Sequence, residues 1–210
     1  MSLCPSIMRG VGSLLPGSRR LVDSELIVRV MSGDRDAFAT LVQSTHARLY
    51  RTATLIVRDP ELAADAVQDA LLAVWVDARA IRDPARFDAW LNRLLIRGCV
   101  RSARKVRHRS AIEIQVLPSD RGSSDESYAL VGLRDEIARA FEQLTVEHRA
   151  VLVTHHYLEL ADGEAAAALE IPLGTYKSRL HRATDALRAV IEAADRTPGS
   201  PPGELTDVTA

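Results

Sequence analysis

A stretch near the C-terminus decides the fold, and it runs Ile171-Pro172-Leu173-Gly174-Thr175-Tyr176-Lys177-Ser178-Arg179-Leu180-His181-Arg182-Ala183. An alanine-rich segment precedes it, and we expect a short helix there over Gly163–Leu169, capped by Asp162. Pro172 ends this helix, because proline disfavours helical geometry in the residue before it. Gly174-Thr175 then begins a second helix. Two short helices joined by so tight a turn form a helix-turn-helix unit, whose second helix enters the major groove of DNA.

The second helix of this unit has two distinct faces. At about 100° per residue, the apolar stripe that would pack into the core comprises Tyr176, Leu180, Ala183 and Leu187. The opposite side carries Thr175, Ser178, Arg179 and Arg182, with Lys177 and His181 flanking it. No acidic residue occurs in this part of the helix, although residues 131–196 hold 8 basic against 11 acidic residues. Such a face suits contacts to phosphates and guanine edges, and a solvated face with incidental arginines is the alternative.

Residues 171–183 resemble the region 4 signature of the extracytoplasmic-function (ECF) sigma factors, in which a valine commonly replaces Tyr176. The helices that precede this signature in the family are matched by Leu144, Arg149, Val151 and Leu152. Thr145 stands where the family usually has proline, and Ala165-Ala166 where a Glu-Ile pair is common. The resemblance implies a helix that reads the −35 promoter element. The implied −35 contacts are Thr175, Lys177, Ser178, Arg179 and Arg182.

The N-terminal half is also predicted to be helical, because Ala, Leu and Arg are abundant and aromatic residues make up only 4% of the chain. Turn and helix-start signals divide it at Ser32-Gly33-Asp34, Arg58-Asp59-Pro60 and Arg82-Asp83-Pro84. We therefore expect four helices at about 23–31, 34–57, 60–78 and 84–108. The predicted fold class is all-α, with two small helical domains joined by a flexible linker.

The third of these helices carries a candidate docking surface. Its core stripe comprises Val67, Ala70, Leu71 and Val74, while the other side gathers Asp65, Gln68, Asp69 and Leu72. Such a cluster suits a protein partner, and a plain solvated face is the alternative. The run from Ala63 to Leu71, with Trp75 following, resembles region 2.2 of the same family. This resemblance, which Asp36-Ala37-Phe38, Tyr50-Arg51 and Phe87-Asp88-Ala89-Trp90-Leu91 extend, implies that the cluster binds the largest subunit of RNA polymerase core.

The fourth helix is the most basic part of the chain, with seven basic residues and no acid from Asn92 to Arg109. One face, about a third of the circle at helical spacing, carries Arg93, Arg97, Arg101, Arg104 and Arg107, which we call the arginine stripe. Leu91, Leu95, Cys99 and Val106 lie opposite. Such a stripe tracks a phosphate backbone and binds it with salt-dependent affinity. A membrane-surface helix is the alternative, although the domain's core needs the apolar face.

By resemblance the fourth helix is region 2.3–2.4, which holds the −10 element and traps the opened strand. The implied −10 contacts are Trp90, Arg93, Arg97, Arg101 and Arg104, with Trp90 either a stacking wedge or a core residue. Family members usually carry Asn near Arg97 and Asp near Arg101. We therefore expect backbone binding to persist, whereas the family's −10 base preference is not carried over to this chain.

Composition sets the expected domain limits. Residues 1–20, interrupted by proline and glycine, are expected to be a disordered leader and not a signal peptide. Region 2 would occupy 21–109, a polar linker 110–130, region 4 131–196 and a disordered tail 197–210. The linker holds one basic and four acidic residues. Its acids either solubilise the chain or, as the resemblance implies, lie inside the polymerase near nascent RNA.

No motif in the sequence predicts a catalytic or cofactor site. Cys4 and Cys99 lack metal-type spacing, and His155 with Glu159 offers two helical ligands without a third. There is no glycine-rich phosphate loop or nucleophile elbow, and the apolar runs are too short to span a membrane. We therefore expect a cytoplasmic protein that is not an enzyme, holds no cofactor or metal, and is monomeric when free.

The sequence as a whole predicts an alternative sigma factor that binds RNA polymerase core and promoter DNA, and the resemblance adds an anti-sigma protein as a partner. The main rival is a helix-turn-helix regulator that dimerises and acts without polymerase. A more distant rival is an RNA- or membrane-binding scaffold. The net acidity of residues 131–196 also gives the arginine stripe an internal electrostatic partner. We therefore expect the free protein to be held closed, by contact between its domains or by a partner.

Overall fold

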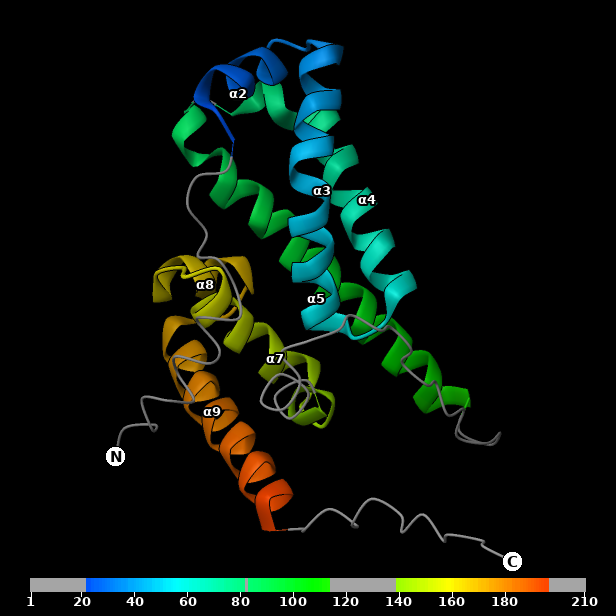
Figure 1. Ribbon diagram of the computed structural model, residues 1–210, viewed down its shortest axis with the longest axis vertical. Coiled ribbons are helices and arrows are strands. Elements are labelled where there is room, and N and C mark those ends of the chain that lie inside the picture. Colours follow the sequence, from blue (N-terminus) through cyan, green and yellow to red (C-terminus); the bar gives the residue numbers. More distant parts are fainter. Residues whose placement is uncertain (1–21, 82, 114–138, 197–210) are drawn as a thin grey trace, which may run out of the picture.

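The computed structural model describes residues 22–81, 83–113 and 139–196, and within these ranges every regular element is helical (Figure 1). Helices α2–α5 form an N-terminal domain, and α7–α9 form a C-terminal domain that packs against α3 and α5. The all-α prediction with two small domains is confirmed. The expected leader at 1–20, most of the expected linker at 110–130 and the expected tail at 197–210 lie outside the described residues.

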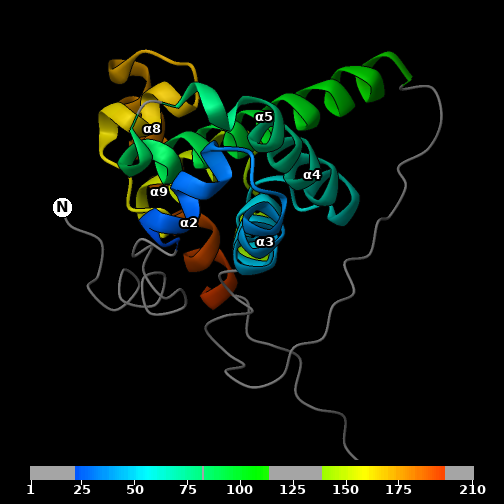
Figure 2. The ribbon, with the colours of Figure 1, turned by 90° about the horizontal axis from the view of Figure 1, so that it is seen from above.

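The described part of the N-terminal domain contains α2 Ser24–Met31, α3 Arg35–Val57, α4 Pro60–Asp77 and α5 Phe87–Glu113. Two short 3-10 turns, η1 Ala78–Ala80 and η2 Pro84–Arg86, lie between α4 and α5. The first three helices match the predicted ranges closely. The fourth starts later than expected because Pro84–Arg86 form the 3-10 turn, and it continues to Glu113, past residue 109, where we expected the domain to end. Viewed from above, this end of α5 projects away from α8 and α9 (Figure 2).

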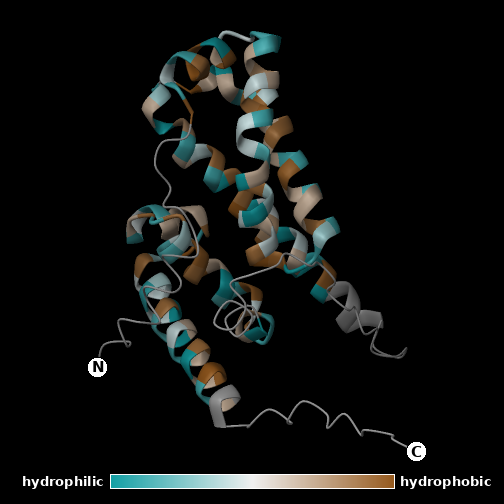
Figure 3. Ribbon diagram, in the orientation of Figure 1, coloured by the Kyte–Doolittle hydropathy of each residue, from teal (hydrophilic) through white to brown (hydrophobic). Residues whose placement is uncertain are grey.

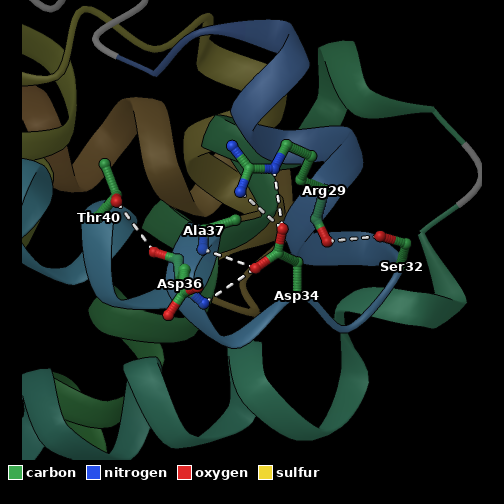
Figure 4. Close-up of polar contacts among 6 residues, drawn as sticks. All are labelled: Arg29, Ser32, Asp34, Asp36, Ala37 and Thr40. Carbon is green, nitrogen blue, oxygen red and sulfur yellow. Dashed lines mark hydrogen bonds and ion pairs between the residues drawn. The ribbon is translucent and has the colours of Figure 1, made fainter.

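Aspartates fix where these helices begin. Asp23, Asp34, Asp59 and Asp83 each precede a helix and accept backbone N–H groups from its first turn. Asp34 is the most connected, because one carboxylate oxygen accepts from the amides of Asp36 and Ala37 at 2.9 and 3.0 Å. Its other oxygen pairs with Arg29 at 2.7 Å, which ties α2 to the start of α3 (Figure 4). These caps satisfy donors that a helix N-terminus otherwise leaves unpaired.

The core of the N-terminal domain lies between α3, α4 and α5. The stripe predicted on α4 is buried as expected, and it comprises Val67, Ala70, Leu71 and Val74. From the helices on either side, Leu41, Leu49, Leu91 and Leu95 are fully enclosed. Burial of aliphatic side chains at this helical spacing holds the three helices together and leaves their other faces for solvent or partners.

The described part of the C-terminal domain contains α7 Val146–Leu152, a π-helical turn Val153–Tyr157, α8 Asp162–Ala168 and α9 Leu173–Arg196. Thr145 caps α7 by accepting from the amide of His148 at 3.2 Å, so a side-chain cap replaces the proline that the family usually has there. Tyr176 is fully buried, and its hydroxyl lies 3.3 Å from that of Thr154. Apolar and hydrophilic residues alternate along α9, as expected for a helix with one buried face (Figure 3).

Two local expectations in this domain were wrong. Asp162 does not cap α8; it is the first residue of that helix, and its carboxylate faces His155 at 3.7 Å and Lys177 at 3.9 Å. His155 and Glu159 do not share a helix, because the π-helical turn ends at Tyr157 and Glu159 adopts a left-handed conformation with φ 50°. No helix in the described ranges is both long enough and apolar enough to cross a bilayer.

Candidate nucleic-acid and protein interfaces

The turn between α8 and α9 is a closed hydrogen-bonded motif. The amide of Glu170 donates to the carbonyl of Ala167 at 3.3 Å, and that of Ile171 donates to Ala166 at 3.1 Å. Glu170 itself is left-handed, with φ 55°. This pairing is the Schellman ending of a helix, in which glycine usually takes the left-handed position. The turn lets α9 start at Leu173, one residue before the predicted Gly174.

The polar face predicted on α9 is largely accessible. Lys177, Ser178 and Arg182 are exposed, whereas Thr175 and Arg179 are half-buried. Arg182 lies along its own helix, where its Nε donates to the carbonyl of Ser178 at 3.2 Å. The pKa of His148 on α7 is lowered by burial and by the charges of Arg182 and Arg179, so His148 is neutral beside them at neutral pH. The face therefore presents positive charge and hydroxyl groups to solvent.

The cluster predicted on α4 is exposed at all four positions, namely Asp65, Gln68, Asp69 and Leu72. Leu72 exposes 58% of its surface. Gln68 and Leu72 also line a groove of about 660 Å³ between α3 and α4, whose other walls include Phe38 and Trp75. Two of the four residues in the predicted cluster therefore belong to the wall of an apolar groove.

Sequence reasoning missed the aromatic part of this groove. Trp75 is 40% exposed, and its ring lies 5.0 Å from that of Phe38 on α3. Val76 is 64% exposed. Leu72, Trp75 and Val76 are spaced i, i+3 and i+4, so they share a helical face, and this spacing is the signal that could have found the patch.

The arginine stripe lies along α5, opposite a buried face. Leu91, Leu95 and Cys99 are enclosed, and burial raises the pKa of the Cys99 thiol to about 12. Across the helix, Arg101, Arg104 and Arg107 are exposed, whereas Arg93 and Arg97 are half-buried. Trp90 is half-buried too, with its ring 5.9 Å from that of Phe87, so it packs at the edge of the core.

Part of the stripe is already paired with the C-terminal domain. Arg97 lies 3.3 Å from Glu170 and also donates to the carbonyl of Ala167 at 3.3 Å. Arg104 and Arg107 both reach Glu147 on α7, at 3.5 and 3.3 Å. Sequence patterns could not show these pairs, because their partners are 40 or more residues away.

A buried arginine also joins the two domains. Arg149 on α7 is 7% exposed, and it donates to the carbonyls of Leu144 and Ile56 at 2.7 Å each. Ile56 belongs to the last turn of α3, where carbonyls lack partners within their own helix. Burial and the nearby charge of Arg58 lower the pKa of Arg149 to about 10, so it stays charged at neutral pH.

The described residues contain no group of three His, Cys, Asp or Glu side chains placed to hold a metal ion. His155 and His156 meet edge to face, with ring centroids 4.6 Å apart. Burial and the charge of His155 lower the pKa of His156 to about 4, so His156 is neutral in the folded protein at neutral pH. Its environment is that of a packed histidine.

Both domains match models of known families. Residues 41–109 match Sigma-70 region 2, and residues 134–187 match Sigma-70 region 4. The chain is 34% identical over 182 residues to the ECF RNA polymerase sigma factor SigM of Mycobacterium tuberculosis, covering 86% of this chain and 87% of SigM. It is 34% identical over 169 residues to SigL of the same species, covering 77% and 95%.

Solved structures show the same likeness. CnrH in complex with the cytosolic domain of CnrY matches with a TM-score of 0.56 and 26% identity, over 81% of this chain and 97% of that chain. The sigma factor RpoE from Bartonella quintana, in complex with the anti-sigma factor NepR, shares the fold with a TM-score of 0.59 and 22% identity, over 74% and 96%. With matched regions 2 and 4 in order and relatives that span most of its length, the chain belongs to the ECF sigma factors, which bind RNA polymerase core and direct promoter-specific initiation.

Proposed function

We propose that this sigma factor works through three separate surfaces, one for polymerase core and two for promoter DNA. The observation that carries the proposal is their placement on three different helices, each on the side away from the core that it helps to build. The cluster on α4 would bind polymerase, the arginine stripe on α5 would hold the −10 element, and the polar face of α9 would read the −35 element.

The surface for polymerase combines charge with an apolar centre. Asp65 and Asp69 supply the acidic edge, and the groove with Trp75 and Leu72 supplies the apolar part. Aromatic and aliphatic anchors inside a polar rim are the arrangement from which protein interfaces draw most of their binding energy. We assign Asp65, Gln68, Asp69 and Leu72 to core binding, together with the groove that they border.

The two DNA surfaces differ in chemistry, and so they suit different tasks. The stripe is guanidinium-rich, and Arg93, Arg97, Arg101 and Arg104 would track the backbone of −10 DNA, with Trp90 at its edge. The α9 face mixes hydroxyl, ammonium and guanidinium groups on a helix that follows a tight turn. Thr175, Lys177, Ser178, Arg179 and Arg182 would therefore contact base edges and phosphates at −35.

Sigma factors are regulators without a catalytic step of their own, and we propose the same for this chain, with catalysis left to the polymerase. We further propose that it acts in the cytoplasm as a monomer when free, and that it has an anti-sigma partner. RpoE motivates the last point, because it was solved with the anti-sigma factor NepR. The proposed limits of its functional regions are 21–109 and 131–196, with 110–130 as the tether.

Runoff transcription with purified core polymerase tests the proposed function. A genomic promoter library is transcribed with core alone and with core plus the full-length protein, and the transcripts are sequenced at their 5′ ends. Defined start sites that depend on the protein are expected. An unchanged transcript profile, together with binding of the protein to a palindromic site as a dimer, would instead support the helix-turn-helix regulator that acts without polymerase.

A further inference from the structure

The C-terminal domain places two carboxylates on the arginine stripe. Glu147, in the first turn of α7, lies between Arg104 and Arg107, and Glu170, in the turn after α8, lies against Arg97. Both acids come from segments that are distant in sequence yet lie beside α5 (Figure 1). The stripe therefore already has two anionic partners, both supplied by the C-terminal domain.

Glu147 is well placed to act as a fixed anion. Its side chain is only 17% exposed, so solvent screens its pairs less than those of a surface acid. Burial alone would raise the pKa of Glu147, but backbone hydrogen bonding at the start of α7 and the charges of Arg107 and Arg104 outweigh burial. The pKa therefore lies below its ordinary value, and Glu147 is ionised at neutral pH.

Glu170 contacts the stripe from a left-handed backbone conformation, which is unfavourable for glutamate. The left-handed region is strained for glutamate, because its Cβ lies too close to the following carbonyl oxygen. Arg97 also bonds the carbonyl of Ala167, near the C-terminal end of α8, where the helix dipole is negative. Glu170 and this carbonyl together present Arg97 with the features of a phosphate, namely a charged oxygen beside a second acceptor.

The same segment covers more of the stripe than these ion pairs. A cleft of about 150 Å³ lies between the domains, lined on one side by Arg97, Arg101 and Arg104 and on the other by Ala168, Leu169 and Glu170. Arg101 therefore also faces the turn after α8. A DNA strand that followed the stripe would need the volume that this turn occupies.

Two further contacts hold the C-terminal domain in this position. Arg149 binds the carbonyl of Ile56 in the last turn of α3 at 2.7 Å. Arg58, the left-handed residue that ends α3 with φ 58°, pairs with Glu142. Two of the three non-glycine residues with positive φ in the described ranges, Arg58 and Glu170, thus make ion pairs between the domains.

The other two functional surfaces are not covered in the same way. Leu72 and Trp75 on α4 are exposed, and Lys177 on α9 pairs with Asp162, which belongs to its own domain. Of the three functional surfaces, the −10 surface is the one on which the ion pairs between the domains fall in the described residues.

We propose that the C-terminal domain is an internal substitute for −10 DNA, with Glu147 and Glu170 standing where phosphates would bind the arginine stripe. The inference rests on the assignment of the stripe to −10 DNA. In the closed protein the polymerase groove stays available, so core polymerase binds first through α4. Movement of the C-terminal domain away from α5 then frees the stripe for DNA, and free protein in the absence of core holds −10 DNA weakly.

The test compares full-length wild type with the double variant Glu147→Gln and Glu170→Gln. The probe is a short fluorescein-labelled single-stranded DNA of mixed sequence, followed by fluorescence anisotropy at matched salt. Loss of three partly exposed ion pairs should tighten DNA binding about three- to tenfold. Small-angle X-ray scattering should show a larger radius of gyration in the double variant, because the domains separate more often.

A matched control separates masking from simple loss of negative charge. Glu61→Gln with Glu164→Gln makes the same charge change, with one exposed acid in each domain. This control should bind the oligonucleotide like wild type and keep the wild-type radius of gyration. Equal tightening in both double variants, or an unchanged radius of gyration in the Glu147 and Glu170 variant, overturns the proposal.

Runoff transcription on the same proteins distinguishes failure of this inference from failure of the proposed function. In one outcome the wild type directs initiation, but the double variant neither opens nor binds DNA more tightly. This result supports the proposed function and contradicts self-masking. In the other outcome the double variant opens and binds DNA more tightly, but no variant supports initiation. This result supports the closed state of the free protein and contradicts its role as a sigma factor. At high salt the wild type should expand toward the radius of the double variant, because screening weakens the same ion pairs.

Discussion

The arginine stripe on α5 and the polar face of α9 have similar chemistry but opposite surroundings. Both combine arginines with an apolar face that packs into a core, and both face nucleic acid in our proposal. Three of the stripe's arginines are paired with carboxylates of the other domain, whereas Lys177 on α9 is paired with Asp162 of its own domain. Positive charge alone therefore does not make a surface available to DNA. Its availability also depends on the acidic residues that pack against it.

The comparison predicts that substitutions on surfaces without ion pairs to the other domain affect partner binding fully in the free protein. The largest effect is expected on α4, where Asp65→Arg with Asp69→Arg should abolish co-purification with core polymerase. Reversing close charges at an interface costs on the order of 2–5 kcal/mol. Circular dichroism should remain that of wild type, because both side chains are exposed. Asp77→Arg, an exposed reversal at the end of the same helix, should still co-purify, and equal competition for core by the double variant would place the interface elsewhere.

Arg182→Ala should produce the next largest effect, on the open face of α9. If Arg182 forms a bidentate contact with a base, its loss should weaken binding at one or two −35 positions by about 1–3 kcal/mol. Systematic base substitution in a gel-shift assay measures this loss position by position. A loss that is the same for every −35 sequence would mean that Arg182 contacts only phosphate and that another residue reads the bases.

On the arginine stripe, alanine substitutions at neighbouring arginines should weaken DNA binding to different extents. Arg101→Ala should weaken single-stranded DNA binding evenly across sequences and reduce the salt slope by about one, because one phosphate contact is lost. Arg97→Ala should weaken it less, since removing Arg97 also removes an ion pair that holds the protein closed. Salt titrations of both variants by anisotropy check the order, and identical losses would contradict a role for Arg97 in closure.

The smallest expected effect is on the pH dependence of thermal stability, to which His156 in the C-terminal domain contributes. An unfolded histidine has a pKa of about 6.5, whereas that of His156 is lowered to about 4 by burial and by His155. Between these values the unfolded chain binds a proton that the folded chain does not, so stability falls as pH drops from 6.5 toward 4. Between pH 7 and 5, His156→Gln should reduce the fall in melting temperature by a few degrees.

Local structure was predictable where a periodic pattern and its start signals agree. The buried stripe of α4 and the aspartate caps follow from spacing and from residue type at the helix starts. The turn after α8 was also foreseen from Pro172, and the family followed from motifs in both domains. These features depend on residues close in sequence, whose energetics a single helix or turn decides.

Features that depend on packing between distant segments were not predictable at the level of residues. Net acidity of residues 131–196 suggested an internal partner for the stripe, yet nothing in the pattern singled out Glu147 or Glu170. Asp162 looked like a cap, but the backbone of Ala161 takes that position, and the π-helical turn before it moved Glu159 off the helix. The exposure of Trp75 depended on α3 leaving a groove beside α4.

The left-handed Glu170 has a consequence for genetics. Glycine is the residue best suited to that backbone position, and a single-base change converts either glutamate codon into a glycine codon. Such a mutation would relax the turn while it removes the carboxylate from Arg97, so stability and release of the stripe would improve together. A selection for overactive alleles should therefore recover Glu170→Gly repeatedly, as a dominant gain of function in a protein that melts no lower than its parent.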